Sequence, residues 1–389
     1  MALLRKKRLE PGNNETGQKD LIGENTKGRM DFSILITTII LVCFGVLMVY
    51  SSSFYVAQQQ YQDPYYFFKK QAIGAAIGLA ALLFFSWLDY KKLGKIKFIF
   101  LLCSIALLGL VLIPGVGSSI RGSSRWFNIA GTSVQPAEIA KIAFILFAAS
   151  FMALHPERMK YFLKGLLPLL LILGIMVLFL LMQPNFSTVI AMSLLCVAMM
   201  YVGGAKKWHV VGIGVGGLGG GFALLFSEPY RVKRLLAFLD PWADPQVNGY
   251  QLIQSLYSLG SGGLFGRGLG NSRQKYLFLP FGESDFIFSI VGEEFGFIGA
   301  LCLLLLFGFL IWRCIRVAYK STDKFGCYIA TGISALIAIQ VLMNVGVVTG
   351  SIPPTGLPLP FISSGSSSLV IMMASMGVML NISKQIVRM

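Results

Sequence analysis

Residues 279–296 read LPFGESDFIFSIVGEEFG and mark the place where a polar loop becomes an apolar helix. Asp285 stands at the junction, and Glu293 and Glu294 follow inside an otherwise apolar run. A charged side chain at bilayer depth costs about 2.5–3.5 kcal/mol on insertion scales, so such residues face a protein interior or a water-filled cavity. We therefore expect the rest of the chain to hold a polar cavity around Asp285.

Composition places the chain among membrane proteins. Of its 389 residues, 55% are hydrophobic and only 13% are charged. That charged share is about half of what an ordinary soluble domain carries. Repeated apolar runs are each long enough to cross about 30 Å of hydrocarbon as a helix. The sequence thus predicts an all-α, polytopic transmembrane bundle.

Ten apolar segments are expected to form the membrane helices. They are residues 32–52, 71–88, 96–114, 137–154, 165–182, 186–203, 208–226, 286–312, 326–349 and 366–382. Residues 1–30 contain seven Lys or Arg with Gly and Asn, which predicts a disordered cytoplasmic tail. Residues 31–389 form one membrane domain, in which residues 227–285 are a large extracytoplasmic loop between helices 7 and 8.

Lysine and arginine are concentrated in alternate loops, which is an orientation signal. With ten crossings, these loops and both termini fall on the cytoplasmic side of the cytoplasmic membrane. The net charge of +16 follows from this bias and does not indicate nucleic acid. On the outer side, residues 351–365 (SIPPTGLPLPFISSG) hold four prolines and no charge. Such a segment is expected to be re-entrant or interfacial and to line a cavity.

Several polar residues could perform chemistry near this cavity. Glu138 and Lys141 are three apart on one predicted helix face, where an ion pair is either structural or shapes the cavity. In residues 227–285, six bases bracket five acids, as expected where an anionic ligand such as a diphosphate binds near a carboxylate. The bases are Arg231, Lys233, Arg234, Arg267, Arg273 and Lys275.

Asp285 is the strongest candidate for a general base, and a plain helix N-cap is the alternative. On a continuous helix, Glu293 lies roughly 12 Å further along the axis and rotated by about 80°, which makes it a better candidate than Glu294 for the same cavity. The six cysteines are scattered singly, without Cys/His spacing, so no metal site is predicted from the chain alone.

Five separated stretches give the sequence a specific resemblance. They are SSRWFNI…SVQPAEIAK, PYRVKRLLAFLDPWADP, GYQLIQSLYSLGSGGLFGRGLGNSRQKYLFLP, SDFIFSIVGEEFGFIG and NVGVVTGSIPPTGLPLPFISSGSSSL. With them, the chain from about residue 30 onward resembles the SEDS family of bacterial cell-wall polymerases (the FtsW/RodA/SpoVE family). It is most similar to the division and sporulation branch of that family.

The resemblance implies a peptidoglycan glycosyltransferase in the bacterial cytoplasmic membrane. Members polymerise lipid II, a disaccharide-pentapeptide on undecaprenyl diphosphate, together with a class B penicillin-binding protein and other division proteins. The essential aspartate of the family falls on Asp285, and its characteristic Trp, Glu, Lys and Arg fall on Trp126, Glu138, Lys141 and Arg231.

In the mechanism that this resemblance suggests, Asp285 takes a proton from the acceptor hydroxyl. Arg231, Arg273 and Lys275 stabilise the leaving lipid diphosphate, and Glu293 lines the same cavity. A divalent cation, Mg²⁺ or Mn²⁺, is expected to be held partly by diphosphate oxygens.

The sequence departs from the family pattern at three places. Asn185 replaces an acid, Phe281 replaces another acid while Glu283 appears two positions later, and SSGSSS replaces the commoner SYGGSS. Two other classes of function stay open, a lipid II flippase and a non-enzymatic division scaffold. The glycine-rich segment 208–226 is compatible with a flippase, but the asymmetric loops and the lack of an inverted repeat favour the polymerase.

Overall fold

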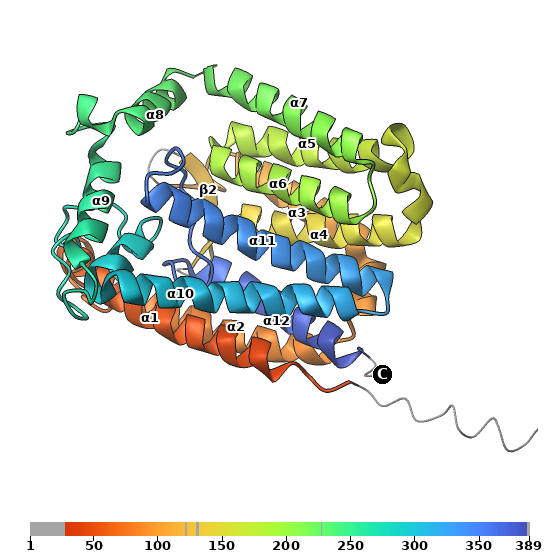
Figure 1. Ribbon diagram of the computed structural model, residues 1–389, viewed down its shortest axis with the longest axis horizontal. Coiled ribbons are helices and arrows are strands. Elements are labelled where there is room, and N and C mark those ends of the chain that lie inside the picture. Colours follow the sequence, from red (N-terminus) through yellow and green to blue (C-terminus); the bar gives the residue numbers. More distant parts are fainter. Residues whose placement is uncertain (1–27, 121–122, 130–131, 227, 387–389) are drawn as a thin grey trace, which may run out of the picture.

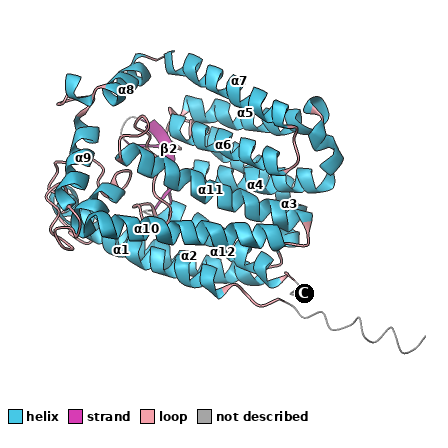
Figure 2. Cartoon of the chain, viewed as in Figure 1, coloured by secondary structure: helices cyan, strands magenta, loops and turns pink. Residues whose placement is uncertain are grey.

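The computed structural model describes residues 28–120, 123–129, 132–226 and 228–386 (Figure 1), so most of the predicted tail lies outside the described residues. Helices make up most of it (Figure 2). They are α1 (Phe32–Tyr61), α2 (Tyr66–Trp87), η1 (Tyr90–Lys92), α3 (Leu93–Leu110), α4 (Pro136–Leu154), η2 (Pro156–Lys160), η3 (Phe162–Leu166), α5 (Leu167–Met182), α6 (Phe186–Val202), α7 (Lys207–Phe226), α8 (Pro229–Leu239), η4 (Pro241–Ala243), α9 (Tyr250–Gly262), α10 (Ile287–Lys320), α11 (Lys324–Val348) and α12 (Ser366–Lys384).

Every one of the ten predicted apolar segments lies on a helix. Among the described residues, nine helical spans are long and apolar enough to cross a membrane, and α6, with 17 residues, is a shorter apolar helix. The prediction of an all-α, multi-pass membrane protein is confirmed. The crossing by α6, and with it the count of ten, stays a prediction.

The segments predicted to lie outside the membrane contain more regular structure than the sequence indicated. The strands β1 (Ser118–Ile120), β2 (Ser123–Ile129) and β3 (Thr132–Val134) form a small antiparallel sheet, in which Trp126 pairs with Ser118. The loop 227–285 contains α8 and α9. β1 and β3 have three residues each, and β2, SSRWFNI, does not alternate apolar with polar residues, which is why this sheet was not predicted.

Close helix packing depends on glycines between α2 and α12, the most extensive contact between any two described elements. A Cβ added at Gly377 of α12 would overlap the carbonyl oxygen of Leu82 in α2, and one at Gly78 would overlap the sulfur of Met373. Small residues at such positions let helix backbones approach in an apolar medium, where packing is a main source of association.

The two ends of the described chain meet at one end of the bundle. The backbone N–H of Asp31 donates to Ser383 Oγ at 3.1 Å, and its carboxylate pairs with Arg313 Nη2 at 2.6 Å. These bonds join the start of α1 to the last turns of α12 and to the later part of α10. A chain with an even number of membrane crossings likewise begins and ends on the same side of the membrane. The sheet, α8 and α9 lie toward the opposite end (Figure 1).

We expect Gly377→Ala to lower the stability of the bundle by about 1–3 kcal/mol, because the new methyl group meets backbone that is costly to move. Thermal unfolding in detergent measures the effect. Gly308→Ala is the matched control, since nothing lies within 4 Å of a Cβ added there. Equal melting temperatures for the two variants would contradict the close α2–α12 packing.

Candidate functional site

Asp285 lies in a turn that leads into α10, and its side chain is half-buried. The turn begins at Phe281, whose φ of 61° is left-handed. A non-glycine residue in such a conformation costs about 1–3 kcal/mol and persists where its surroundings hold it. The Phe281 carbonyl accepts from the N–H groups of Ser284 at 3.0 Å and Phe286 at 3.3 Å. Phe281, one of the departures from the family pattern, thus forms the turn that presents Asp285.

Residues 351–365 close around this turn. The segment has no regular helix, and the side chains of Leu357, Leu359, Phe361 and Ile362 are buried, as expected for a re-entrant loop. Ser363 Oγ donates to the Ser284 carbonyl at 2.6 Å, and the Ser364 N–H donates to the Glu283 carbonyl at 2.9 Å. A Cβ added at the exposed Gly356 would lie 3.1 Å from Asp285 Oδ2. The glycine therefore leaves space directly beside the carboxylate.

Asn344 of α11 joins the turn to this segment. Its Nδ2 donates to the carbonyl oxygens of both Asp285 and Leu357, each at 2.8 Å, and the residue is 1% exposed. Asn344 was not among the predicted site residues. The signal that could have found it is an amide side chain within an otherwise apolar helix, where a polar group needs a specific partner.

Arg231 of α8 lies close to the same segment. Its Nη1 donates to the Leu224 carbonyl at 2.6 Å, and its guanidinium carbon lies 5.4 Å from the centre of the Phe186 ring. The next residue, Ser187, accepts a hydrogen bond from the Gly356 N–H at 3.0 Å. The first turn of α6 therefore contacts both the cation and the segment beside Asp285.

Before this turn, Asn185 stands where the family pattern has an acid. Its Oδ1 accepts a hydrogen bond from Thr188 Oγ1 at 2.9 Å, so a neutral amide binds a side chain of the first turn of α6. Arg125 of β2 donates to the carbonyl oxygens of Gln183, at 2.8 Å, and Pro184. These bonds attach the sheet, in which the half-buried Trp126 follows Arg125, to the α5–α6 turn.

Glu138 and Lys141 form a buried ion pair at the start of α4, with 2.7 Å between Oε1 and Nζ. Ser368 of α12 donates to Glu138 Oε2 at 3.1 Å. Because Ser363, just before α12, binds the turn at Ser284, the beginning of α12 connects this ion pair to the neighbourhood of Asp285.

Glu293 and Glu294 both bind the loop that precedes the Asp285 turn. Glu293 accepts from Ser272 Oγ at 2.5 Å and from the Arg273 N–H at 2.9 Å. Glu294 accepts from Ser51 Oγ at 2.7 Å and pairs with Lys275 Nζ at 3.3 Å. Lys275 is thus buried in an internal ion pair, whereas the Arg273 side chain is exposed.

The same loop forms backbone hydrogen bonds on both sides of a break in α10. Gly296, with φ 68° and ψ −170°, interrupts the helix. The N–H groups of Arg267 and Gly268 donate to the carbonyls of Glu293 and Glu294, both at 3.0 Å. The N–H groups of Phe297 and Ile298 donate to the carbonyls of Gly263 and Leu264 at 2.9 and 3.1 Å. The loop thereby satisfies backbone groups that an interrupted helix leaves open inside an apolar bundle.

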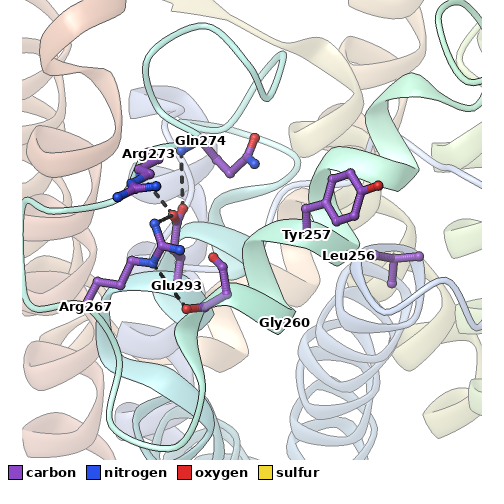
Figure 3. Close-up of a pocket in the computed structure, with 8 residues that line it drawn as sticks. Leu256, Tyr257, Gly260, Arg267, Arg273, Gln274 and Glu293 are labelled. Atoms are coloured by element: carbon purple, nitrogen blue, oxygen red, sulfur yellow. Dashed lines mark hydrogen bonds and ion pairs between the residues drawn. The ribbon is translucent and has the colours of Figure 1, made fainter.

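A pocket of about 400 Å³ lies between α9, this loop and α10 (Figure 3). It is lined by Leu256, Tyr257, Gly260, Ser261, Arg267, Arg273, Gln274 and Glu293. The structure therefore divides the predicted site residues into two sets. Asp285, Arg231, Trp126 and the Glu138–Lys141 pair are connected through α6, α12 and segment 351–365, whereas Glu293, Arg273 and Lys275 are connected through the loop beside α9.

A metal cage is not formed by the protein in its described parts, because no three or more His, Cys, Asp or Glu side chains converge there. A divalent cation near Asp285, held partly by substrate oxygens, stays a prediction.

Taken together, the fold and this site define a multi-pass membrane protein with an acid-centred polar site at one end of its helical bundle. The family model described as cell cycle protein, FtsW/RodA/SpoVE, matches residues 32–387. The chain belongs to this family.

Relatives and solved structures agree over nearly the whole chain. Stage V sporulation protein E of Bacillus subtilis (strain 168) is 44% identical over 354 residues, covering 91% of this chain and 97% of its own. The probable peptidoglycan glycosyltransferase FtsW of Geobacter sp. (strain M18) is 40% identical over 353 residues, covering 91% and 96%.

Among solved structures, one similar chain comes from work on the coordination of polymerization and crosslinking by a peptidoglycan synthase complex. It has a TM-score of 0.75 at 27% identity, covering 91% of this chain and 97% of that one. The rod shape determining protein RodA of Thermus thermophilus has a TM-score of 0.67 at 25% identity, covering 92% and 98%.

We expect Glu138→Gln to destabilise the protein by about 3–5 kcal/mol, because it leaves the buried Lys141 ammonium without its counter-charge. The double variant Glu138→Leu/Lys141→Leu should recover most of that loss, since apolar pairs often replace buried ion pairs at little cost. Thermal unfolding in detergent distinguishes the two. A double variant as unstable as the single one would show that the ion pair itself is required for folding.

Proposed function

We propose that this protein is a peptidoglycan glycosyltransferase that polymerises lipid II at the outer face of the bacterial cytoplasmic membrane, with Asp285 as its general base. The observation that carries the proposal is the placement of Asp285. Its turn is held by Asn344 and Ser363, and its carboxylate lies next to a glycine that leaves space for a substrate. The names of the relatives support the reaction class.

In the proposed reaction, Asp285 accepts the proton of an acceptor sugar hydroxyl. The oxygen then attacks the anomeric carbon of the donor glycan, and a new glycosidic C–O bond forms there. The bond from that carbon to the lipid diphosphate breaks, and the diphosphate leaves with the electron pair. The reaction needs positive charge at the leaving oxygens and two substrates held in line.

Arg231 is the cation best placed for the leaving diphosphate. It contacts the first turn of α6, whose Ser187 binds Gly356 beside Asp285. A bound Mg²⁺ or Mn²⁺ would add positive charge at the diphosphate oxygens. Trp126 and the Glu138–Lys141 pair would shape the neighbouring wall of the cavity, since the sheet and α12 join them to it.

The proposed setting follows from the loop charges and the relatives. Both termini are on the cytoplasmic side, and the end with Asp285 faces outward. A class B penicillin-binding protein is the proposed partner, because a similar chain belongs to a peptidoglycan synthase complex that couples polymerization and crosslinking. Cell division or sporulation, with other division proteins, is the proposed context.

We expect Asp285→Asn to abolish glycan synthesis, a loss of at least about 100-fold, because the amide cannot accept the proton. The measurement is polymerisation of lipid II by the purified protein with its penicillin-binding partner. The control is Glu157→Gln, which removes an exposed carboxylate from η2, just after the end of α4 that lies away from Glu138. This variant should retain full activity.

Normal glycan synthesis by Asp285→Asn would exclude Asp285 as the base. Transfer of lipid II across liposome membranes, without polymer under any condition, would favour a flippase.

We expect Gly356→Ala to lower kcat about tenfold with little change in KM, because the new methyl group presses on Asp285 Oδ2 and shifts it by a few tenths of an ångström. Steady-state polymerisation rates measure this, with Gly308→Ala as a matched control in open space. An unchanged kcat would place the reacting atoms away from this carboxylate.

A further inference from the structure

The pocket beside α9 has a wall of positive charge that the proposed reaction does not use. Two arginines, Arg267 and Arg273, line it together with one carboxylate, Glu293, so its net charge is positive. Figure 3 shows both guanidinium groups on the same side as the Glu293 carboxylate, with Tyr257 and Leu256 across the pocket. Lys275 adds no further charge, because it is paired with Glu294.

Glu293 positions this wall. The residue is 1% exposed, and its oxygens accept hydrogen bonds from Ser272 Oγ and from the N–H groups of Arg273 and Gln274. It also forms an ion pair with Arg267 Nη1 at 3.5 Å. A carboxylate with this many donors is held in place and is not available to bind a ligand. It fixes the backbone at Arg273 and one end of the Arg267 side chain.

The two arginines keep binding capacity toward the pocket. The Arg267 side chain donates one hydrogen bond, from Nε to the Ser261 carbonyl at 3.2 Å, and forms an ion pair with Glu293 through Nη1, so these contacts engage at most two of the five N–H donors of the guanidinium. Arg273 binds Glu293 through its backbone only, and its side chain is exposed. Two guanidinium groups side by side match the planar oxygens of a carboxylate or phosphate.

We propose that this pocket is a subsite for an anionic group, and that its occupant is a carboxylate of the peptide carried by the glycan substrate. The inference rests on the proposed function. It assigns Arg273, which the sequence grouped with the ligands of the leaving diphosphate, to a different anion.

The position and size of the pocket favour the peptide over the lipid diphosphate. Arg231, in the other set of residues, contacts the α6 turn next to Gly356 and Asp285, where the diphosphate must leave. The pocket instead lies between α9, the loop that follows it and Glu293 of α10. α9 itself contacts α10 one turn after Asp285, through the hydrogen bond between Ser255 Oγ and Ser289 Oγ at 2.7 Å. A volume of about 400 Å³ accommodates a short peptide segment with its carboxylate but not a whole disaccharide-pentapeptide.

The test compares two substrates with three variants, using the protein in complex with its penicillin-binding partner. The substrates are lipid II with free peptide carboxylates and lipid II with those carboxylates amidated. The variants are Arg267→Gln, Arg273→Gln and the control Lys92→Gln, which removes an exposed base at the start of α3, outside residues 227–285, with the same change in charge. Arg273→Lys keeps the charge but loses the paired donors.

For free-carboxylate lipid II, we expect each Arg→Gln change to raise KM about tenfold to a hundredfold with kcat retained, since a charge-assisted hydrogen bond is lost. Arg273→Lys should recover only part of this affinity. For amidated lipid II, the wild-type KM should already be raised, and the same variants should change it by less than about twofold. Lys92→Gln should match the wild type with both substrates.

Equal losses on both substrates would overturn the proposal, because the arginines would then support the loop and not read the carboxylate. A KM that follows the phosphatidylglycerol content of the vesicles in the wild type, but not in the variants, would assign the pocket to a phospholipid phosphate and also overturn it. If the wild type polymerises both substrates with the same KM, only this subsite fails. If it polymerises neither, the proposed function itself fails.

Discussion

The structure depends on satisfying polar groups inside an apolar bundle. A charge or an open backbone group in such surroundings costs several kilocalories per mole unless it has a partner. The bundle meets this requirement at three places: the Glu138–Lys141 pair, the Glu294–Lys275 pair, and the backbone bonds that join residues 263–268 to the break at Gly296. The last two tie a loop to α10, and Ser368 joins the first pair to α12, so the geometry of this end of the bundle follows from where the internal charges are compensated.

This compensation separates structural charges from those that are open to a ligand. Lys141 and Lys275 are both buried, and each forms an ion pair with a carboxylate. Neither ammonium group is therefore open to a diphosphate. Arg273, by contrast, keeps an exposed side chain. The half-buried Asp285 has its backbone fixed by Asn344 and its carboxylate edge beside an exposed glycine. Charged residues of the same type thus take different roles according to what surrounds them.

Local sequence signals predicted the helices and the position of Asp285, but not the partners of the other charges. Apolar runs are a local property, and each of the predicted runs lies on a helix. Asp285 could be found because it is the acid that stands directly at the boundary of two compositions. The partners of Glu294 come from Lys275 in a neighbouring loop and from Ser51 at the other end of the chain, 243 residues away. A helical wheel could place Glu293 relative to Asp285, but it carries no information about the loop that folds against it.

The segment of α10 before Gly296 connects the two sets of residues. It begins directly after Asp285 and ends with Glu293, Glu294 and the backbone bonds to the loop that carries Arg267 and Arg273. Ser255 and Ser258 of α9 hold it in the middle by hydrogen bonds to Ser289. A short helix that is fixed at its middle and its far end allows little movement of one end relative to the other. A carboxylate bound near Glu293 would therefore set the position of the rest of a substrate relative to Asp285. Positioning of this kind lowers the activation barrier because the substrates lose translational and rotational freedom before the reaction begins. It requires rigid connections of the kind that the buried carboxylates provide.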